Sequence, residues 1–214
     1  SMDRVGGDYY DIVAGDKFLG ILLADVSGHG VPAALIVSIV KIAFWFQRAL
    51  LDRPSELLLE MNRALLGNIG SEFVTGCYVY FDHEAAEIHV SNAGHPPAYF
   101  LDRKERTLTS VRPAGRILGI LDEPIFATDV QPFGRGNRMV IYTDGVLEAV
   151  DDSGAFFGAE RLEELIVTTA ELDAESVAQA LLTAVMEWSG GEHRIGDDVA
   201  IIVLDSVDGD ATKG

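Results

Sequence analysis

The hydrophobic positions of the chain follow two different periodicities. Alternating or β-branched apolar runs bounded by polar breaks predict strands at 18–24, 73–82, 87–91, 98–102, 126–130, 138–143 and 199–204. Apolar residues at helical spacing predict helices at 31–50, 54–66, 159–169 and 174–189. The polar breaks DHEAA and DRKER are short enough for hairpins, so we expect neighbouring strands to run antiparallel.

The order of these elements predicts the fold class. One strand is followed by two helices, a block of antiparallel strands, two more helices and a final strand. Helices and strands that are segregated in this way indicate layered α+β architecture and not a wound parallel sheet. We expect one domain over residues 1–205 and a short flexible tail at 206–214.

The segment 31–50 is apolar on nearly every side. Pro32 suits the first turn of a helix, and Lys41 is the charge near its middle. Its length is close to that of a membrane span, which is one interpretation. A helix that is apolar all round is more often buried in a protein core or an interface, and we expect this role without membrane insertion.

The net charge of the chain limits the classes of molecule that it can bind. The chain has 34 Asp and Glu against 16 Lys and Arg, a net charge of −18. Such a field repels nucleic acids and anionic membranes, attracts cations and favours solubility. The single cysteine, Cys77, excludes an internal disulfide and fits a reducing compartment, so we expect a cytoplasmic protein.

Aspartates lie at four boundaries of the predicted strands. Asp8 lies in VGGDYYD, Asp25 in LLADVSGHG, Asp144 in YTDGVLEA, and Asp197 and Asp198 in GDDVAIIVL. Converging carboxylates without His or Cys companions are the ligands of hard cations such as Mg²⁺ or Mn²⁺. Taken singly, each acid has a plain alternative as the cap of a turn or a helix. Their occurrence at four strand ends favours a shared site.

Five motifs in this order resemble one protein family. VGGDYYD, ADVSGHGVPAAL, NAGHPP, YTDGVLEA and GDDVAIIVL are similar to those of the metal-dependent protein phosphatases (PPM), related to the type 2C enzymes. The bacterial SpoIIE/RsbU branch is the closer match, over residues 5–204. The resemblance implies a sandwich of two antiparallel β-sheets flanked by helix pairs, with two metal ions in a cleft between the sheet edges.

The resemblance also implies the metal ligands. Asp25 would bridge two Mn²⁺ or Mg²⁺ ions, and the backbone carbonyl of Val26 would bind one of them. Asp144 and Asp197 would complete one metal site, and Asp8 would serve the other through a water.

Four further residues are candidates for supporting roles. Asp198, the second acid of its pair, is an alternative ligand, and Arg4 is a candidate for binding the substrate phosphate. His29 is a candidate general acid, although it lies four residues after the bridging aspartate where type 2C enzymes have a histidine two residues after it. We interpret His95 as a structural residue that ties down its loop by donating to a backbone carbonyl.

The activity implied by the resemblance is hydrolysis of phosphoserine or phosphothreonine by a metal-activated water. In this branch the substrates are anti-anti-sigma (STAS-domain) proteins of partner-switching pathways. Members usually have an upstream sensor and a helical linker, and this chain starts almost at the first motif, so we expect that region to be absent. Phe44, Trp45 and Phe46 of the predicted helix are candidates for docking a linker or a second copy.

Two alternatives differ in class from this phosphatase. GGDYY superficially resembles the GGDEF signature of diguanylate cyclases, but it lies at residue 6 and leaves the other four motifs unexplained. The other alternative is a phosphatase-like binding or switch module with little activity without its regulatory region. Loss of a ligand acid would indicate such a module, and all four predicted acids are present.

Overall fold

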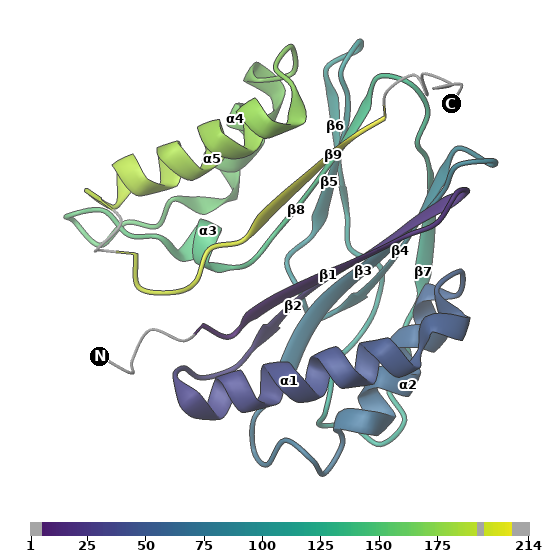
Figure 1. Cartoon of the computed structure of the whole chain (residues 1–214). Coiled ribbons are helices and arrows are strands. Elements are labelled where there is room, and N and C mark those ends of the chain that lie inside the picture. The colour runs from purple at the N-terminus through teal and green to yellow at the C-terminus, as the bar shows by residue number, and fades with distance from the viewer. Residues whose placement is uncertain (1–5, 192–194, 207–214) are drawn as a thin grey trace.

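Four layers, helix–sheet–sheet–helix, make up the computed structural model of the chain, which describes residues 6–191 and 195–206 (Figure 1). Arg4 and the part of the predicted tail from 207 onward lie outside these residues. The layers agree with the predicted α+β sandwich.

Both sheets are antiparallel throughout. The first sheet has the order β1 (Asp8–Ala14), β2 (Phe18–Val26), β3 (Val74–Asp82), β4 (Glu87–Ala93), β7 (Thr128–Pro132). The second has the order β6 (Thr107–Val111), β5 (Ala98–Asp102), β8 (Asn137–Tyr142), β9 (Ile201–Asp205). The strands β1 and β9 are therefore edge strands, one in each sheet.

A pair of helices covers the outer face of each sheet (Figure 1). The helices over the first sheet are α1 (Val31–Phe46) and α2 (Pro54–Leu65), with the 3₁₀ turn η1 (Arg48–Leu50) between them. Those over the second sheet are α4 (Gly158–Thr168) and α5 (Ala174–Trp188), preceded by the single turn α3 (Gly145–Glu148). Proline in the first turn starts both α1 and α2.

Strands with both faces buried explain the continuous apolar runs of the sequence. Successive side chains of a strand point to opposite faces, so Leu22 packs under α1 and α2 while Leu23 packs against the other sheet. A third apolar layer joins the second sheet to its helices through residues such as Leu162 and Leu181. All four leucines are buried. The three layers together hold the ends of the strands in fixed positions.

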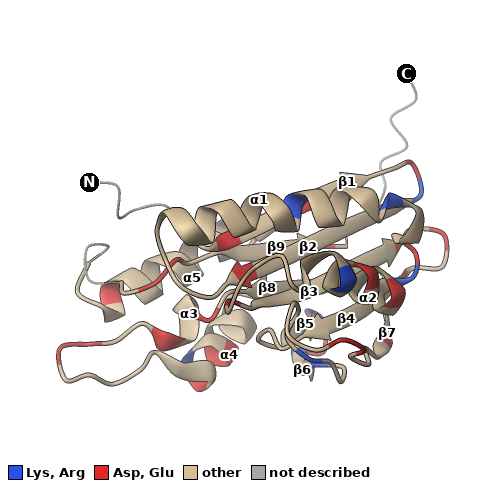
Figure 2. Cartoon of the chain, turned by 90° about the horizontal axis from the view of Figure 1, so that it is seen from below, with Lys and Arg blue, Asp and Glu red and all other residues tan. Residues whose placement is uncertain are grey.

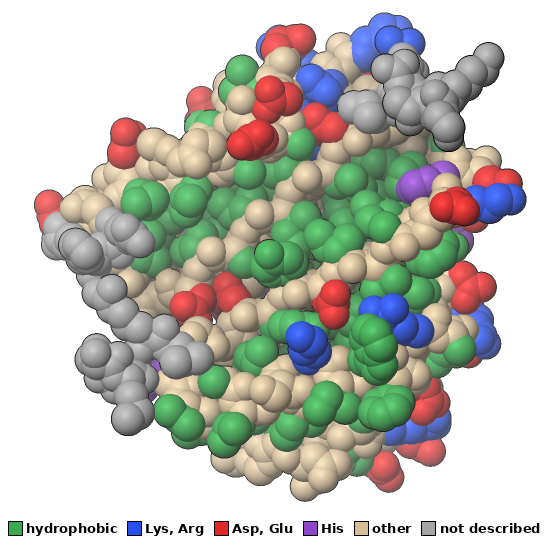
Figure 3. All heavy atoms as spheres, in the orientation of Figure 1, with side chains coloured by type: hydrophobic (Ala, Val, Ile, Leu, Met, Phe, Trp, Pro, Cys, Tyr) green, Lys and Arg blue, Asp and Glu red, His purple; other side chains and the backbone are tan. Residues whose placement is uncertain are grey.

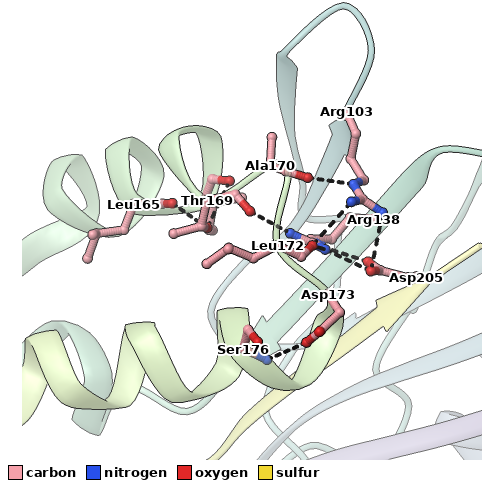
Figure 4. A network of polar contacts seen from close by, with 10 residues as sticks. Arg103, Arg138, Leu165, Thr169, Ala170, Leu172, Asp173, Ser176 and Asp205 are labelled. Atoms are coloured by element: carbon pink, nitrogen blue, oxygen red, sulfur yellow. Dashed lines mark hydrogen bonds and ion pairs between the residues drawn. The ribbon is translucent and has the colours of Figure 1, made fainter.

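A buried ion pair fastens the α4–α5 connection to the second sheet (Figure 4). Arg138 of β8 donates from Nε and Nη2 to the carboxylate of Asp205 in β9, at 2.6 and 2.7 Å. The same guanidinium donates to the carbonyl oxygens of Thr169 and Leu172, and Arg103 also contacts Asp205. The side chain of Arg138 thus links β8 to β9 and to the connection between α4 and α5.

Several predicted boundaries are wrong. The strand expected at 126–130 lies at Thr128–Pro132, and the helix expected at 31–50 ends at Phe46. Of the two roles expected for this helix, burial in the core holds for one face only. Phe44 is buried, whereas Trp45 and Phe46 are 55% and 74% exposed.

The exposed face of α1 carries little charge (Figure 2). Leu35 and Ile42, at 64% and 56% exposure, lie on this face. None of the helices in the described part of the chain combines the length and apolar character that crossing a bilayer requires. The membrane-span interpretation of this segment therefore receives no support.

The two edge strands border a groove on one side of the sandwich. Hydrophobic side chains gather over this side of the molecule (Figure 3). The groove has a volume of about 580 Å³ and is lined by β9, by one face of α5, by Val199 and Ala200, and by Tyr10 of β1.

Candidate active site

The predicted acids meet at one end of the sandwich. Asp8 begins β1 and Asp25 lies near the end of β2, and the two are direct cross-strand partners. Asp144 follows β8, while Asp197 and Asp198 shortly precede β9. Because the end of one antiparallel strand lies beside the start of its neighbour, both pairs of strands bring their acids to the same end.

Hydrogen bonds at this end connect the two sheets. Thr143 at the end of β8 donates from Oγ1 to Oδ2 of Asp8 at 2.7 Å, and the same hydroxyl accepts from the N–H of Ala200 at 2.9 Å. The carboxylate of Asp198 accepts from the N–H of Gly7 at 2.8 Å. The start of β1 is thereby held against the segments that flank β8 and β9.

Glycines permit this close approach. A Cβ atom on Gly6 would meet the Asp198 carboxylate, and one on Gly7 would lie 2.6 Å from the Val26 carbonyl oxygen. A Cβ on Gly145 would meet the backbone carbonyl of Asp198. Glycine is therefore required for steric reasons at Gly7 and Gly145, where the obstacle is backbone, while a side chain at Gly6 would displace the Asp198 carboxylate.

Burial and mutual repulsion disfavour the charged forms of these acids. Burial raises the pKa of Asp8 to about 7; the negative charges of Asp25 and Asp198 also raise it, and the Thr143 hydrogen bond acts in the opposite direction. Burial likewise raises the pKa of Asp25 to about 7, with Asp144 as the strongest charged contributor. Acids of the two sheets therefore repel one another: Asp198 acts on Asp8, and Asp144 acts on Asp25.

Glu148 is an acid of this site that the sequence reasoning missed. Its pKa is raised by burial and then by the charges of Asp144 and Asp197, and it also contributes to the raised pKa of Asp25. It lies four residues after Asp144, one turn along α3, where side chains share a face. The DGVLE spacing was the signal that could have identified it.

The donor set fits divalent cations. No Lys or Arg of the described residues is among the groups that shift the pKa values of Asp8, Asp25, Asp144 or Glu148, and the causes that raise these values are burial and the other acids. Carboxylate and carbonyl oxygens without His or Cys are the preferred ligands of Mg²⁺ and Mn²⁺. Within 6–191 and 195–206, however, no three acidic, His or Cys side chains already surround a common point as ligands would. Binding an ion therefore requires these carboxylates to move closer around a common point.

A hydroxyl and a glutamate fix the backbone beside Val26. Ser27 donates from Oγ to the Glu72 carboxylate at 2.5 Å and accepts from the N–H of Phe73 at 2.9 Å. The N–H of Ser27 donates to the Phe73 carbonyl at 3.0 Å, which extends the β2–β3 pairing one residue beyond Val26. Glu72 was not predicted, because a contact across 45 residues leaves no local pattern in the sequence.

The two candidate histidines differ in environment. His29 is exposed in the loop before α1 and makes no hydrogen bond or ion pair with another described residue. His95 is buried, and burial lowers its pKa to about 4, so the ring is neutral at pH 7. Its Nδ1 lies 2.8 Å from Oγ1 of Thr75, and Asn92 bonds its backbone N–H and carbonyl. His95 thus holds its loop: its ring contacts the hydroxyl of Thr75, and a hydrogen bond with the backbone of Tyr142 opposes part of the fall in its pKa.

Comparison with protein families gives an independent result. The family profile described as Stage II sporulation protein E (SpoIIE) matches residues 15–206. The phosphoserine phosphatases RsbU and RsbP of Bacillus subtilis (strain 168) are 28% and 24% identical over 202 and 210 residues. Each alignment covers 94% of this chain but only 59% of RsbU and 49% of RsbP. The chain therefore spans about half the length of these relatives.

Solved structures share the fold. The SiaA-PP2C domain of Pseudomonas aeruginosa aligns with a TM-score of 0.84 and 24% identity over 94% of this chain and 80% of that one. The RsbU and RsbW domains of Rv1364c from Mycobacterium tuberculosis give 0.77 and 22%, over 95% and 56%. The catalytic domain of the serine/threonine phosphatase PstP, in complex with two manganese ions, gives 0.66 and 18%, over 96% and 93%.

Proposed function

The chain belongs to the SpoIIE family, and on this premise we propose that it is a metal-dependent phosphatase that hydrolyses phosphoserine or phosphothreonine on another protein. The observation that carries the proposal is the group of half-buried carboxylates at one end of both sheets, whose pKa values are raised by burial and by one another, with no cation of residues 6–191 and 195–206 among the causes. Such a group is costly to the fold unless it binds a cation. We further propose that residues 1–205 form the catalytic domain.

The cofactor would be two Mn²⁺ or Mg²⁺ ions. When bound, such ions supply Lewis acidity and a nucleophilic water at neutral pH. The residues that would hold them are Asp8, Asp25, Val26 through its carbonyl, Asp144 and Asp197, with Asp198 as an alternative. Support comes from the oxygen-only donor set and from PstP, a neighbour in fold whose structure contains two manganese ions.

The remaining groups of the chain keep these oxygens in position. Thr143 orients the Asp8 carboxylate, and the Ser27–Phe73 pairing orients the Val26 carbonyl. Asp198 is hydrogen-bonded to the N–H of the residue before Asp8, which favours a structural role over the ligand role for this acid.

Proton supply to the leaving alkoxide is a separate requirement. The exposed imidazole of His29 lies in the loop that directly follows the β2 ligands, and we propose it as a candidate general acid. Asp25 lies four residues before His29 and faces Asp8, so both histidine and carboxylates belong to the same end of the sandwich.

The test of the activity is an isosteric change at the proposed bridging ligand. Asp25→Asn should lower Mn²⁺-dependent hydrolysis of p-nitrophenyl phosphate and of a phosphoserine peptide roughly 100-fold or more, because one ligand charge is lost. Asp16→Asn, an equal change in an exposed turn between β1 and β2, should retain activity. Full turnover in Asp25→Asn would contradict the proposal.

The physiological substrate that we propose is a phosphorylated anti-anti-sigma protein of the STAS type in a bacterial, cytoplasmic partner-switching pathway. The relatives named phosphoserine phosphatase RsbU and RsbP support this choice. An upstream sensor and linker would act through the exposed, mainly apolar face of α1, which includes Leu35, Trp45 and Phe46, and the same face would serve a homodimer.

The second candidate function is a switch module that has little activity without its regulatory region. It is favoured by the carboxylates that lie close together without yet surrounding a common point. Calorimetric titration with Mn²⁺, combined with phosphate release from the phosphorylated STAS protein, separates the two. Metal binding with turnover supports the phosphatase, and metal binding without turnover supports the switch.

A further inference from the structure

A strap, residues 112–118, crosses the end of the sandwich that holds the acids. It begins where β6 ends at Val111, and Leu118 pairs with Val74 at the start of β3 through two backbone hydrogen bonds of 2.8 and 3.2 Å. Between these points Gly115 packs so closely on the backbone carbonyl of Asn92 that a Cβ atom there would overlap it. The strap therefore runs from the second sheet to the first.

The strap and the acids occupy opposite halves of this end. The acids lie at β1, β2, β8 and β9, whereas the strap passes the adjoining ends of β6, β4 and β3. Thr75 connects the halves, because it is the cross-strand partner of Asp25 and its hydroxyl contacts the ring of His95. A ligand held over the acids would extend onto the strap.

Nearly every cation in the described part of the chain is engaged in the fold. Ion pairs, hydrogen bonds or aromatic contacts occupy Lys17, Arg48, Arg53, Arg63, Arg103, Lys104, Arg106, Arg138 and Arg161. Arg135 also has an interaction. Those that make no hydrogen bond, ion pair or aromatic contact with another described residue are Lys41 on α1 and Arg112 and Arg116 on the strap.

The two strap arginines are exposed, and the strap that carries them crosses the end of the sandwich that holds the acids. Burial is the main cause that lowers the pKa of His95, and the positive charge of Arg112 lowers it further. Burial raises the pKa of Tyr142 at the end of β8, and the positive charge of Arg112 partly offsets this rise. Arg116 is adjacent in sequence to Ile117, whose side chain approaches Gly94.

Exposed guanidinium groups on the strap could attract an anionic substrate to a chain that is itself strongly negative. A net charge of −18 disfavours the approach of an anionic phosphoprotein to this chain (Figure 2). Arginine binds carboxylates and phosphates in a bidentate manner and steers anionic partners. We infer that Arg112 and Arg116 bind acidic residues that flank the phosphorylated residue of the protein substrate, an inference that rests on the activity proposed above.

The experiment measures selectivity between two peptides. A fluorescent phosphoserine peptide with Asp and Glu on both sides, and a second with Asn and Gln in their place, are titrated with the Mn²⁺-loaded protein and followed by anisotropy. The unaltered protein should bind the acidic peptide roughly tenfold more tightly at low salt, since two exposed charge contacts have about this strength. R112Q/R116Q should bind both peptides almost equally.

The matched control is K41Q, which removes the other unengaged cation and should retain the selectivity of the unaltered protein. An unaltered preference for the acidic peptide in R112Q/R116Q would overturn the inference, as would an equal loss for both peptides or a loss in K41Q. Hydrolysis of p-nitrophenyl phosphate by the unaltered protein is measured separately. If that turnover is absent while selectivity depends on the two arginines, the proposed activity fails and the anion-binding role stands.

Discussion

At the scale of single residues, the acids of the site are held close together and partly buried, which destabilises their charged forms. Asp8 and Asp25 face each other across β1 and β2, and both have a pKa of about 7 because burial and neighbouring acids disfavour their charged forms. A group of this kind reduces stability in return for a function. The cost should therefore be visible in the metal-free protein and should depend on pH.

We expect the metal-free protein to lose stability as pH rises from about 4 through 7, and little more above 7.5. The folded-state pKa of Asp8 and Asp25 is above the unfolded value of 3.8, so the folded protein holds extra protons between about 4 and 7 and releases them as pH rises through 7. Thermal unfolding in a chelator should show Tm falling over this range, with a shallower fall for Asp25→Asn. A Tm that is constant or rises would contradict the raised pKa values.

The buried histidine should produce the opposite slope at lower pH. The pKa of His95 is about 4 when folded and 6.5 when unfolded, so the unfolded chain binds the additional proton between these values. Its contribution to stability therefore increases as pH rises from 4 to 6.5. The difference in Tm between the unaltered protein and His95→Asn should grow over this range.

The measured quantity is the difference in Tm between the unaltered protein and His95→Asn. The Tm of one protein alone is not sufficient, because Asp8 and Asp25 lower stability as pH rises from 4 to 6.5. His83→Asn, at an exposed position in the β3–β4 turn, is the control and should show a constant difference. A constant difference for His95→Asn as well would mean that its imidazole is not kept neutral by burial.

At the scale of elements, the sequence predicted those whose burial leaves a periodic pattern. The strand 18–24 and the helix 174–189 were placed to within two residues at each end, as β2 and α5, since both bury apolar faces against fixed neighbours. The edge strands β1 and β6 were missed. DYYDIVA and TLTSV have mostly half-buried or exposed side chains, so neither sequence has the apolar run of an inner strand.

The site was predictable to the extent that its residues lie in motifs. Asp25 and Asp144 mark the ends of predicted strands, and antiparallel pairing brings strand ends together. Asp8 begins β1, which was missed, and its role was predicted from the motif VGGDYYD alone. Glu72 and the strap arginines were not predictable in this way. Their positions depend on loops that cross between layers, for which one sequence provides no spacing rule.

The stability of the contact between the α4–α5 connection and the second sheet should depend on the buried ion pair of Arg138 and Asp205. Arg138→Met leaves Asp205 with Arg103 as a partner, whereas Asp205→Ala leaves the fully buried Arg138 guanidinium with carbonyl partners only. We expect Asp205→Ala to lower the free energy of unfolding by about 3 kcal/mol, and the double variant Arg138→Met/Asp205→Leu to recover much of this loss. Urea unfolding provides the measurement.

The control for this pair is a salt bridge on the surface. Arg106→Gln removes the exposed pair with Glu171 and should change stability by less than about 1 kcal/mol. Additive losses in the Arg138/Asp205 double variant would show that the two residues act independently, contrary to the contacts in Figure 4.

At the scale of the whole molecule, the proposed metal site lies where the two sheets meet. Asp8 and Asp25 belong to the first sheet, whereas Asp144 and Asp197 belong to the ends of strands in the second. Protein hydrogen bonds already connect these ends, from Thr143 to Asp8 and from Gly7 to Asp198. An ion held by acids of both sheets would add a connection between layers and remove the repulsion that disfavours their present proximity.

Metal binding should therefore stabilise the entire fold. A ligand at 100 times its Kd that binds only the folded state adds about 2.7 kcal/mol, which corresponds to a rise in Tm of roughly 5–11 °C for a domain of this size. We expect Mn²⁺ to give such a rise at pH 8, where the acids are deprotonated, and Asp25→Asn to lose most of it while Asp16→Asn retains it. NaCl at equal ionic strength is the control, because screening alone would also reduce the repulsion within a chain of net charge −18. An equal rise in NaCl, or an undiminished rise in Asp25→Asn, would show that the ions act on the overall charge and that these carboxylates do not form a metal site.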